Sequence, residues 1–336
     1  MKSRQLGRTG LRVPVLCLGT MTFGLQCDRD TSFAILDRSL EGGLDFLDTA
    51  DVYPLGGTGE TVGRTEELIG EWMQLRNNRD AIVLATKCRG QMGRGANDAG
   101  LSRQHILKAC DASLRRLRTD RIDLYQTHFF DADVRIEETL RALQDLVRAG
   151  KVRYVGCSNY PAWRLAEALM AARELGAEGY VSVQPRYNIL YREIETELLP
   201  LCISQGLGVL VYNPLAGGFL SGKHKLAPEP EEAGRFTLGA AGKMYRHRYW
   251  QETQFAAVER LKKEVEARGL DLVSVAVAWV VAQPGVTSAI IGASKPAQLA
   301  ASLAAAAELE LDESLRAACD ALWWELPRRP VAEGYR

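Results

Sequence analysis

The sequence predicts a closed barrel of eight parallel strands alternating with helices, that is, a (β/α)8 or TIM barrel. Short Val/Ile/Leu-rich runs alternate eight times with helical stretches, and such runs are typical of parallel strands buried on both faces. No linker or shift in composition divides the 336 residues, so we expect a single domain over residues 1–336. The first strand ends at Gly19-Thr20 without the GxGxxG spacing that an open dinucleotide-binding sheet would carry.

The predicted elements follow in a regular order after an N-terminal hairpin, which the alternation of residues 5–13 around Arg8-Thr9-Gly10 indicates. Apolar runs of strand length cover residues 13–18, 44–48, 81–87, 122–127, 152–157, 181–183, 208–212 and 287–291. Helical stretches are expected at residues 33–40, 65–75, 102–117, 134–149, 161–175 and 194–205, and from Pro296 onward. Two segments exceed a simple barrel: a long loop at 213–250, after the seventh strand, and an extra C-terminal helix at 312–326.

The composition argues against several classes of function. Hydrophobic residues make up 46% and charged residues 25%, an ordinary balance for a globular protein. The 42 basic residues equal the 42 acidic ones, so neither a nucleic acid nor a membrane surface is an expected partner. No apolar run follows Lys2 and Arg4 as in a secretory signal, and the run at 272–282 is too short to span a bilayer. The seven cysteines lack zinc or disulfide spacing, which favours free thiols in a reducing cytoplasm and no bound metal.

Ionisable residues stand where three consecutive strands end. Asp48 closes the second strand, Lys87 closes the third and His128 follows the fourth, while Tyr53 lies one short loop beyond Asp48. The carboxyl ends of barrel strands meet at one rim, so we expect these four side chains to converge there. Each also has an ordinary interpretation: a helix cap for Asp48 or an ion pair with Lys87, a hydrogen-bonded core residue for His128, and a surface ring for Tyr53.

Together the four residues suit proton donation to a carbonyl group. A tyrosine hydroxyl, with an ordinary pKa of about 10, is a weak acid at neutral pH. The neighbouring ammonium of Lys87 would stabilise the phenolate and is expected to lower the pKa of Tyr53, with Asp48 as its counter-charge. His128 would offer a second donor to the substrate oxygen. The set therefore predicts carbonyl reduction.

Three stretches resemble the aldo-keto reductase superfamily, and the resemblance extends over nearly the whole chain. They are residues 43–53 (GLDFLDTADVY), 146–159 (LVRAGKVRYVGCSN) and 212–223 (YNPLAGGFLSGK). The resemblance implies a bacterial NADPH-dependent aldo/keto reductase whose cofactor lies extended across the barrel mouth without a Rossmann domain. It also implies that Tyr53 is the general acid, that Lys87 and Asp48 tune it, and that His128 orients the carbonyl.

The resemblance further implies the cofactor contacts. Ser158, Asn159 and Gln184 match positions that hold the nicotinamide carboxamide, and Tyr212 matches the ring that stacks on the nicotinamide. The site of the 2′-phosphate matches the start of the last barrel helix, where free amide groups attract an anion. The full set of expected cofactor residues is Thr20, Ser158, Asn159, Gln184, Tyr212, Asn213, Leu215, Gly217, Leu220, Lys223, Gly292, Ser294, Lys295 and Gln298.

The sequence departs from the family pattern around the expected site. Pro54 follows Tyr53 where glycine is usual, and a Gly-rich stretch at 56–59 lengthens the loop. Asn213 stands where serine is usual, and Lys295 is the only basic residue near the 2′-phosphate, so NADPH is expected with NADH as an alternative. An apolar substrate wall, suited to aromatic or aliphatic carbonyls unless these side chains instead pack beneath the loop, is expected from Met21, Phe23, Phe129 and Phe130.

Two other functions stay open at this point. A buried lysine in a (β/α)8 barrel can form a Schiff base, so Lys87 could serve a lyase. The chain could also be a regulatory subunit that binds NADPH without turnover, like channel-associated members of the superfamily. A small carbonyl compound is the partner that the sequence predicts. The physiological substrate and the oligomeric state are left open.

Overall fold

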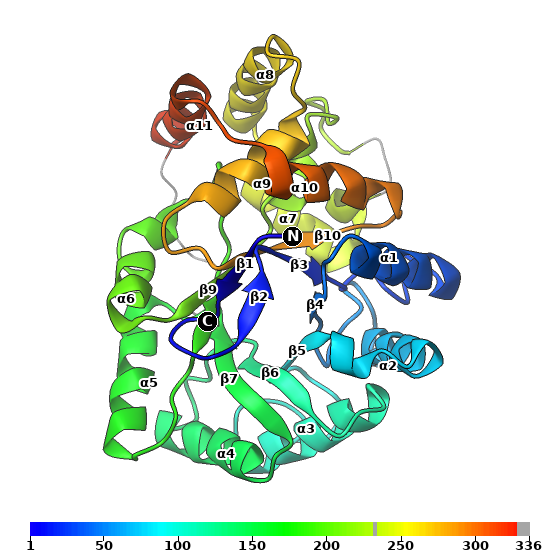
Figure 1. Cartoon of the computed structure of the whole chain (residues 1–336), viewed down its shortest axis with the longest axis vertical. Helices are drawn as coiled ribbons and strands as arrows, with labels where there is room; N and C mark the ends of the chain where they lie inside the picture. The colour runs from blue at the N-terminus through cyan, green and yellow to red at the C-terminus, as the bar shows by residue number, and fades with distance from the viewer. Residues whose placement is uncertain (231–233, 328–336) are drawn as a thin grey trace.

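The computed structural model describes residues 1–230 and 234–327 and contains a closed barrel of eight parallel strands (Figure 1). β10 pairs with β3 from Ala289–Leu16 to Gly292–Gly19, which closes the ring. The predicted TIM-barrel fold is therefore confirmed. In order around the barrel the strands are β3 (Leu16–Gly19), β4 (Phe46–Asp48), β5 (Val83–Cys88), β6 (Ile122–Thr127), β7 (Val152–Ser158), β8 (Ser182–Gln184), β9 (Gly208–Tyr212) and β10 (Ser288–Gly292).

An antiparallel hairpin precedes the barrel, as predicted, and Figure 1 shows it across the near end of the ring. It consists of β1 (Ser3–Gln5) and β2 (Arg12–Pro14). Gly7, with φ +60°, lies against the starts of β8 and β9, where an added Cβ would come within 2.8 Å of three backbone atoms. Leu6 is fully buried and joins the apolar side chains that fill the barrel interior. The hairpin thus covers the end of the barrel opposite the carboxyl ends of the strands.

Helices cover the outside of the barrel (Figure 1). Ser102 caps α3, because its Oγ accepts a hydrogen bond from His105 N at 3.2 Å. α4 buries Leu140, Leu143 and Leu146 along its inner face. The helices that alternate with the strands are α1 (Arg29–Glu41), α2 (Arg64–Arg76), α3 (Arg103–Arg116), α4 (Ile136–Arg148), α5 (Ala162–Glu174), α6 (Leu198–Gln205) and α9 (Leu272–Ala282), and α10 (Ala297–Glu308) follows the last strand.

The segment expected to be a long loop at 213–250 contains more regular structure than predicted. It includes the short 3-10 helices η3 (Ala216–Ser221) and η4 (Arg235–Thr237) and the helix α7 (Gly239–Tyr249). The rings of Phe219, Phe236 and Trp250 pack together there, with centroid separations from 5.1 to 6.3 Å. These aromatic contacts hold the segment in place through packing rather than through a strong local pattern.

Two further helices lie outside the ring, side by side at the top of Figure 1. The extra C-terminal helix is confirmed as α11 (Glu313–Glu325), and α8 (Glu252–Glu266) was not predicted. Asp320 of α11 accepts hydrogen bonds from Arg192 Nη1 at 2.6 Å and from Trp279 Nε1 at 3.2 Å. These bonds connect α11 to the barrel and to α9.

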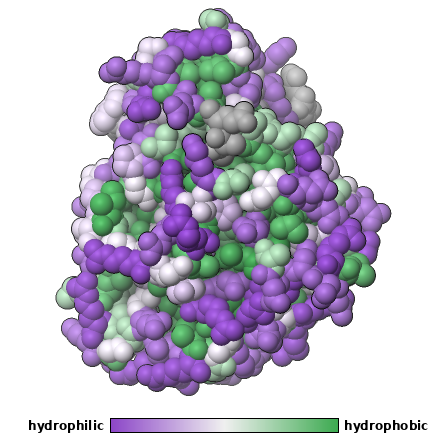
Figure 2. Space-filling model, viewed as in Figure 1, coloured by the Kyte–Doolittle hydropathy of each residue, from purple (hydrophilic) through white to green (hydrophobic). Residues whose placement is uncertain are grey.

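The molecular face in Figure 2 is mostly hydrophilic, with hydrophobic side chains scattered among polar ones. Across residues 1–230 and 234–327, no helix is both long and apolar enough to cross a bilayer. All seven cysteines lie within the described ranges and are buried free thiols, as predicted. Within those same ranges, no three metal-ligating side chains gather into a possible ion site.

Candidate active site

Lys87 and Asp48 form a buried ion pair at the carboxyl ends of β5 and β4. The Lys87 side chain is fully buried, and its Nζ lies 2.5 Å from Asp48 Oδ2 and donates to Thr49 O at 2.8 Å. Burial by itself would lower the pKa of Lys87, but the charges of Asp48 and Tyr53 outweigh it and raise the pKa. Lys87 therefore stays charged at neutral pH.

The second oxygen of Asp48 binds two side-chain amides. Gln184 Nε2 donates to Asp48 Oδ1 at 2.8 Å, and Gln126 Nε2 donates to it at 3.1 Å. Gln126 was not predicted, although its place on β6 two residues before His128 was a usable signal, because alternate strand residues share a face. Both carboxylate oxygens of Asp48 thus accept hydrogen bonds, which suits an ionised carboxylate because it is an acceptor only.

Tyr53 lies between Lys87 and His128. Lys87 Nζ is 5.2 Å from the centre of the Tyr53 ring, and the rings of Tyr53 and His128 meet edge-on with centroids 5.8 Å apart. Burial raises the pKa of Tyr53, whereas the charge of Lys87 acts in the opposite direction. The expectation of a lowered pKa is wrong in its net direction, because loss of hydration outweighs the ammonium. Tyr53 thus keeps its proton at neutral pH, as a proton donor must.

His128 is neutral in this site. Burial lowers its pKa well below the ordinary value, and the positive charges of Lys87 and Arg89 lower it further. Its backbone N donates to Cys88 O at 2.9 Å, and its carbonyl accepts from Asn159 Nδ2 at 3.0 Å. A neutral imidazole can donate one N–H to a carbonyl oxygen. The side chains of Asp48, Tyr53, Lys87 and His128 therefore meet at one rim of the barrel.

The residues expected to hold a carboxamide form one hydrogen-bonded chain across the ends of β7, β8 and β9. Tyr212 OH donates to Asn159 Oδ1 at 2.8 Å, and Asn159 Nδ2 donates to Ser158 Oγ at 3.0 Å. Ser158 Oγ in turn donates to Gln184 O at 2.8 Å. Asn159 has φ +58°, a conformation that asparagine adopts more readily than most residues. This mixture of donors and acceptors fits an amide-bearing ligand.

The strap, which we define as residues 213–223, crosses the rim after β9. Asn213 Oδ1 accepts a hydrogen bond from Gly217 N at 2.5 Å, and its Nδ2 donates to Tyr249 OH at 2.9 Å. Gly217, with φ +73°, lies against Tyr245, and an added Cβ would come within 2.6 Å of the ring. The Asn213 side chain therefore fixes the strap to α7.

Three other strap residues with expected cofactor contacts differ in exposure. Leu220 is fully buried and Leu215 is partly buried against the core, so these two side chains anchor the strap. Lys223 is exposed at the end of the strap.

Thr20, at the end of β3, is fully buried, and its hydroxyl donates to Asp48 O at 2.9 Å. The Thr20 side chain thus holds β4 in place.

The expected phosphate site lies at the start of α10, where Gly292 is exposed just before Ser294. Gln298 Oε1 accepts hydrogen bonds from Ser294 N at 2.8 Å, from Ser294 Oγ at 3.2 Å and from Lys295 N at 3.2 Å. Three donors converge on one oxygen, as they would on an oxygen of a bound phosphate. The donor set at Ser294 and Lys295 therefore fits an anionic group, and in this structure Gln298 Oε1 accepts all three hydrogen bonds.

The residues expected to line the substrate lie in different environments. The Phe129 side chain is 38% exposed and stacks on His128 with ring centroids 5.3 Å apart, and Met21 is partly exposed. Phe130 is partly buried and packs on Tyr160, with centroids 6.0 Å apart. Phe23 is fully buried, because the chain turns inward after β3 with Phe23 N bonded to Thr20 O. Met21 and Phe129 therefore remain accessible, whereas the Phe23 ring belongs to the core.

Two residues near the rim come from the segment that the sequence assigned to a loop. Arg235 Nη1 lies 3.4 Å from Tyr245 OH and 3.6 Å from Met21 Sδ. Tyr245 lies near Tyr53 and contributes to the raised pKa of Tyr53. Sequence reasoning missed both Arg235 and Tyr245. The sequence feature that could have indicated them is the concentration of basic and aromatic residues at 235–250.

Asp51, in the same loop as Tyr53, is a fully buried carboxyl group. Neither of its oxygens has a hydrogen-bond partner among the residues that the structure describes. Burial, reinforced by the nearby charge of Glu66, raises its pKa from 3.8 to about 8. Asp51 is therefore protonated at neutral pH, and its ionisation opposes folding.

We expect Asp51→Asn to stabilise the protein by an amount that grows between about pH 4 and pH 8. The pKa of Asp51 is higher in the folded state, so stability is fully present below 3.8 and is lost as pH rises through about 8. The amide of Asp51→Asn cannot ionise, so the variant avoids this loss of folding stability. The loss reaches a few kcal/mol at about pH 8. Urea denaturation at pH 5, 7 and 9 measures the change, with exposed Asp120→Asn as control. An equal effect at pH 5 and pH 9 would contradict the assignment.

The comparisons identify this barrel as an oxidoreductase that acts on carbonyl or alcohol groups. The chain matches the model of the Aldo/keto reductase family over residues 15–323, and it belongs to that family. It is 40% identical to the uncharacterized oxidoreductase YrpG of Bacillus subtilis over 94% of each chain. It is 36% identical to a probable voltage-gated potassium channel subunit beta of Arabidopsis thaliana over 89% of each chain. It is also similar to an aryl-alcohol dehydrogenase (NADP+) of Phanerodontia chrysosporium, with 34% identity over 88% of this chain and 79% of that protein.

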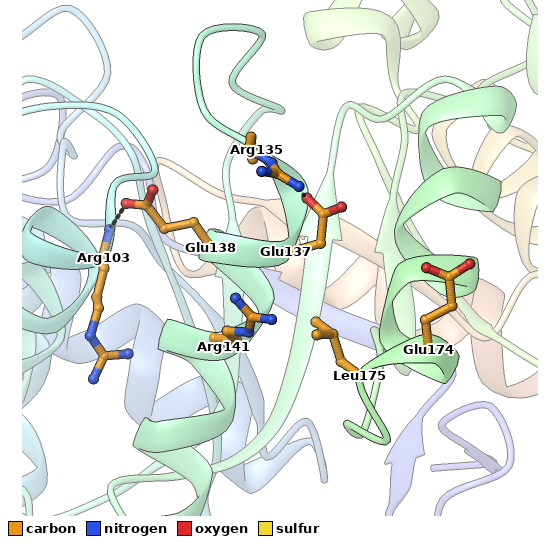
Figure 3. Close-up of a pocket in the computed structure, with 7 residues that line it drawn as sticks. All are labelled: Arg103, Arg135, Glu137, Glu138, Arg141, Glu174 and Leu175. Atoms are coloured by element: carbon orange, nitrogen blue, oxygen red, sulfur yellow. Dashed lines mark hydrogen bonds and ion pairs between the residues drawn. The ribbon is translucent and has the colours of Figure 1, made fainter.

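A separate cavity of about 650 Å³ lies among α3, α4 and α5 (Figure 3). Its charges are largely compensated, since Arg103 Nη1 lies 2.6 Å from Asp145 Oδ2 and Arg135 Nε lies 3.6 Å from Glu137 Oε2. The lining residues are Arg103, Arg135, Glu137, Glu138, Arg141, Glu174 and Leu175. None of the predicted catalytic, cofactor or substrate residues lines it, so this cavity is distinct from the candidate active site.

Proposed function

We propose that this protein reduces an aldehyde or ketone to an alcohol with NADPH, and that Tyr53 donates the proton. The observation that carries the proposal is the position of Tyr53 between a charged Lys87–Asp48 pair and a neutral His128. This arrangement combines a protonated acid, a cation that stabilises its conjugate base, and a neutral hydrogen-bond donor. Such a set is suited to a carbonyl oxygen that gains negative charge.

The residues would act in the following way. A bound nicotinamide would supply the hydride to the carbonyl carbon. His128 and the Tyr53 hydroxyl would hold the substrate oxygen, which takes the Tyr53 proton as its negative charge grows. Lys87 would stabilise the phenolate that remains, and Asp48 would keep Lys87 charged. The same groups run the reaction in reverse, oxidising the alcohol.

NADPH is the proposed cofactor because the start of α10 supplies three donors and the exposed Lys295 for a phosphate. The family resemblance and the NADP+ named for the aryl-alcohol dehydrogenase relative support this choice. The rest of the cofactor would lie along the strap, Tyr212 and the amides of Asn159 and Gln184. NADH is the alternative, since Lys295 lacks the fork geometry of arginine. We also infer one domain over the chain and a cytoplasmic location, which the buried free thiols support.

The test is turnover by the purified protein with a panel of aromatic and aliphatic aldehydes. We expect loss of NADPH absorbance that depends on the aldehyde, an alcohol product, and a higher kcat/KM with NADPH than with NADH. Cofactor binding is measured separately by protein fluorescence. Tight NADPH binding with no turnover on any carbonyl would contradict the proposal.

A second candidate function is a non-catalytic subunit that binds NADPH. It is favoured by the 36% identity to proteins named as probable potassium channel beta subunits. The presence of all four rim residues in one cluster favours the enzyme instead. Co-purification of this protein in a stable complex with another protein, together with no turnover of any carbonyl compound, would support the subunit function.

The Schiff-base lyase has little support from the site geometry. A lysine nucleophile must lose its proton, yet Lys87 is paired with Asp48 at 2.5 Å and its pKa is raised by Asp48 and Tyr53 despite burial. Borohydride in the presence of an aldehyde should therefore leave Lys87 unmodified.

A further inference from the structure

Arg89 holds a strained backbone conformation beside the candidate active site. It directly follows β5, and its φ of +120° lies in a region that side-chain-bearing residues rarely adopt. Neighbouring contacts fix this conformation, since Arg89 O accepts from Gly100 N at 2.9 Å and Cys88 O accepts from His128 N at 2.9 Å. Strain that the surroundings maintain in this way is often found at binding sites.

The guanidinium of Arg89 keeps most of its hydrogen-bonding capacity. Its Nε donates to Phe130 O at 3.1 Å. Among residues 1–230 and 234–327, no carboxylate lies within ion-pair distance of Arg89, and neither Nη atom donates to a protein group. By contrast, Arg164, whose Cζ is 5.4 Å from the Phe130 ring, is paired with Glu167 at 2.6 Å. Arg89 is therefore a partly buried cation without a protein counter-ion.

Arg89 lies on the same side of the rim as the group proposed to hold the carbonyl. Its Cζ is 5.9 Å from the centre of the Phe129 ring, and that exposed ring stacks on His128 at 5.3 Å. The charge of Arg89 also reaches His128, whose pKa it lowers after burial and Lys87 have done so. His128 is neutral and Lys87 is paired with Asp48, so neither of these rim residues supplies a counter-charge to Arg89.

We propose that Arg89 binds an anionic substituent of the substrate, so that the protein prefers carbonyl compounds carrying a carboxylate or a phenolate. This inference rests on the proposed carbonyl reduction, because it places the carbonyl at Tyr53 and His128. An aromatic ring between the two groups would lie along Phe129, and the two Nη atoms would donate to the anion. Arg89 is thus a specificity-determining residue and takes no part in proton or hydride transfer.

The test compares 3- and 4-carboxybenzaldehyde with their neutral methyl esters in NADPH-dependent reduction. We expect kcat/KM to favour at least one acid over its ester by about tenfold or more, mainly through KM, since bonds to a charged group contribute that much. The preference should weaken at high ionic strength. In Arg89→Gly the preference should disappear, because kcat/KM for the acid falls to the level of its ester. Glycine suits a φ of +120°, so this variant should be at least as stable as the parent.

Arg89→Gln and Arg164→Gln complete the design. Arg89→Gln should behave like Arg89→Gly, whereas Arg164→Gln is the matched control and should keep the preference. Retention of the acid preference in both Arg89 variants, or equal kcat/KM for acid and ester in the parent, would overturn the inference. If no aldehyde is reduced at all, the proposed function fails, and calorimetric binding of 4-(hydroxymethyl)benzoate to the NADP+-loaded parent and Arg89→Gly then decides the role of Arg89 by itself.

Discussion

We expect Tyr53→Phe to lower kcat for carbonyl reduction by about a thousandfold, within the range that removal of a general acid or base produces. The substitution removes one hydroxyl and leaves the ring between Lys87 and His128. The Lys87–Asp48 pair at 2.5 Å does not depend on that hydroxyl, so the charge arrangement of the site persists. Without a proton donor, however, the substrate oxygen keeps the negative charge that hydride transfer creates.

Steady-state and single-turnover measurements with NADPH and an aldehyde test this result, and fluorescence titration reports cofactor affinity, which should not change. Tyr160→Phe is a suitable control, because Tyr160 is a buried tyrosine whose hydroxyl contacts Tyr180 and Thr127 instead of the rim residues. It should keep most of the parent activity. Parent-like turnover in Tyr53→Phe would remove Tyr53 from the mechanism.

The second large effect is expected from Asp48→Asn, which should destabilise the fold by about 3–5 kcal/mol, as loss of one partner of a buried ion pair does. Every polar neighbour of the Asp48 carboxylate is a donor: Lys87 Nζ on Oδ2, and Gln126 and Gln184 amides on Oδ1. An asparagine would turn an NH2 group toward one of these donors and leave the Lys87 charge buried without a counter-ion. Lys87 would then release its proton more easily, so the support for a Tyr53 phenolate would also weaken.

Urea denaturation measures the loss of stability, and turnover at several pH values measures the effect on the site. Asp80→Asn is the control, because that carboxylate also pairs with a cation, Arg121, but its side chain is 92% exposed. Exposed pairs contribute little, so its midpoint should hardly move. Equal midpoints for Asp48→Asn and Asp80→Asn would show that the buried pair does not stabilise the barrel.

The barrel and its rim could be predicted because both follow from local patterns combined with one geometric rule. Runs such as residues 81–87 and 208–212 are apolar enough to mark buried parallel strands, and they form β5 and β9. The rule that carboxyl ends of barrel strands meet then brought together Asp48, Lys87 and His128. Gln126 was not predicted, because that rule selects the residues at each strand end and Gln126 lies within β6, two residues before His128.

Other features depend on contacts that no local pattern encodes. The α7 segment has no strong apolar stripe and is held by rings such as Phe219 and Trp250. By contrast, α8 buries Ala257, Leu261 and Val265 at a spacing of four residues, so the sequence does carry the apolar stripe of this helix, although the helix was not predicted. The direction of the Tyr53 pKa and the burial of Phe23 both depend on how much water the folded chain excludes, which residue types alone do not determine.

The pairing of β3 with β10 has a consequence for synthesis on the ribosome. The strand that completes the ring is made last, so a nascent chain ending before β10 has two open sheet edges, at β3 and at β9. Ring closure must bring together strands far apart in the sequence, such as Leu16 and Ala289, and such long-range pairing is slow. Until then the incomplete barrel exposes unpaired backbone groups at two strand edges, and such edges favour aggregation and chaperone binding.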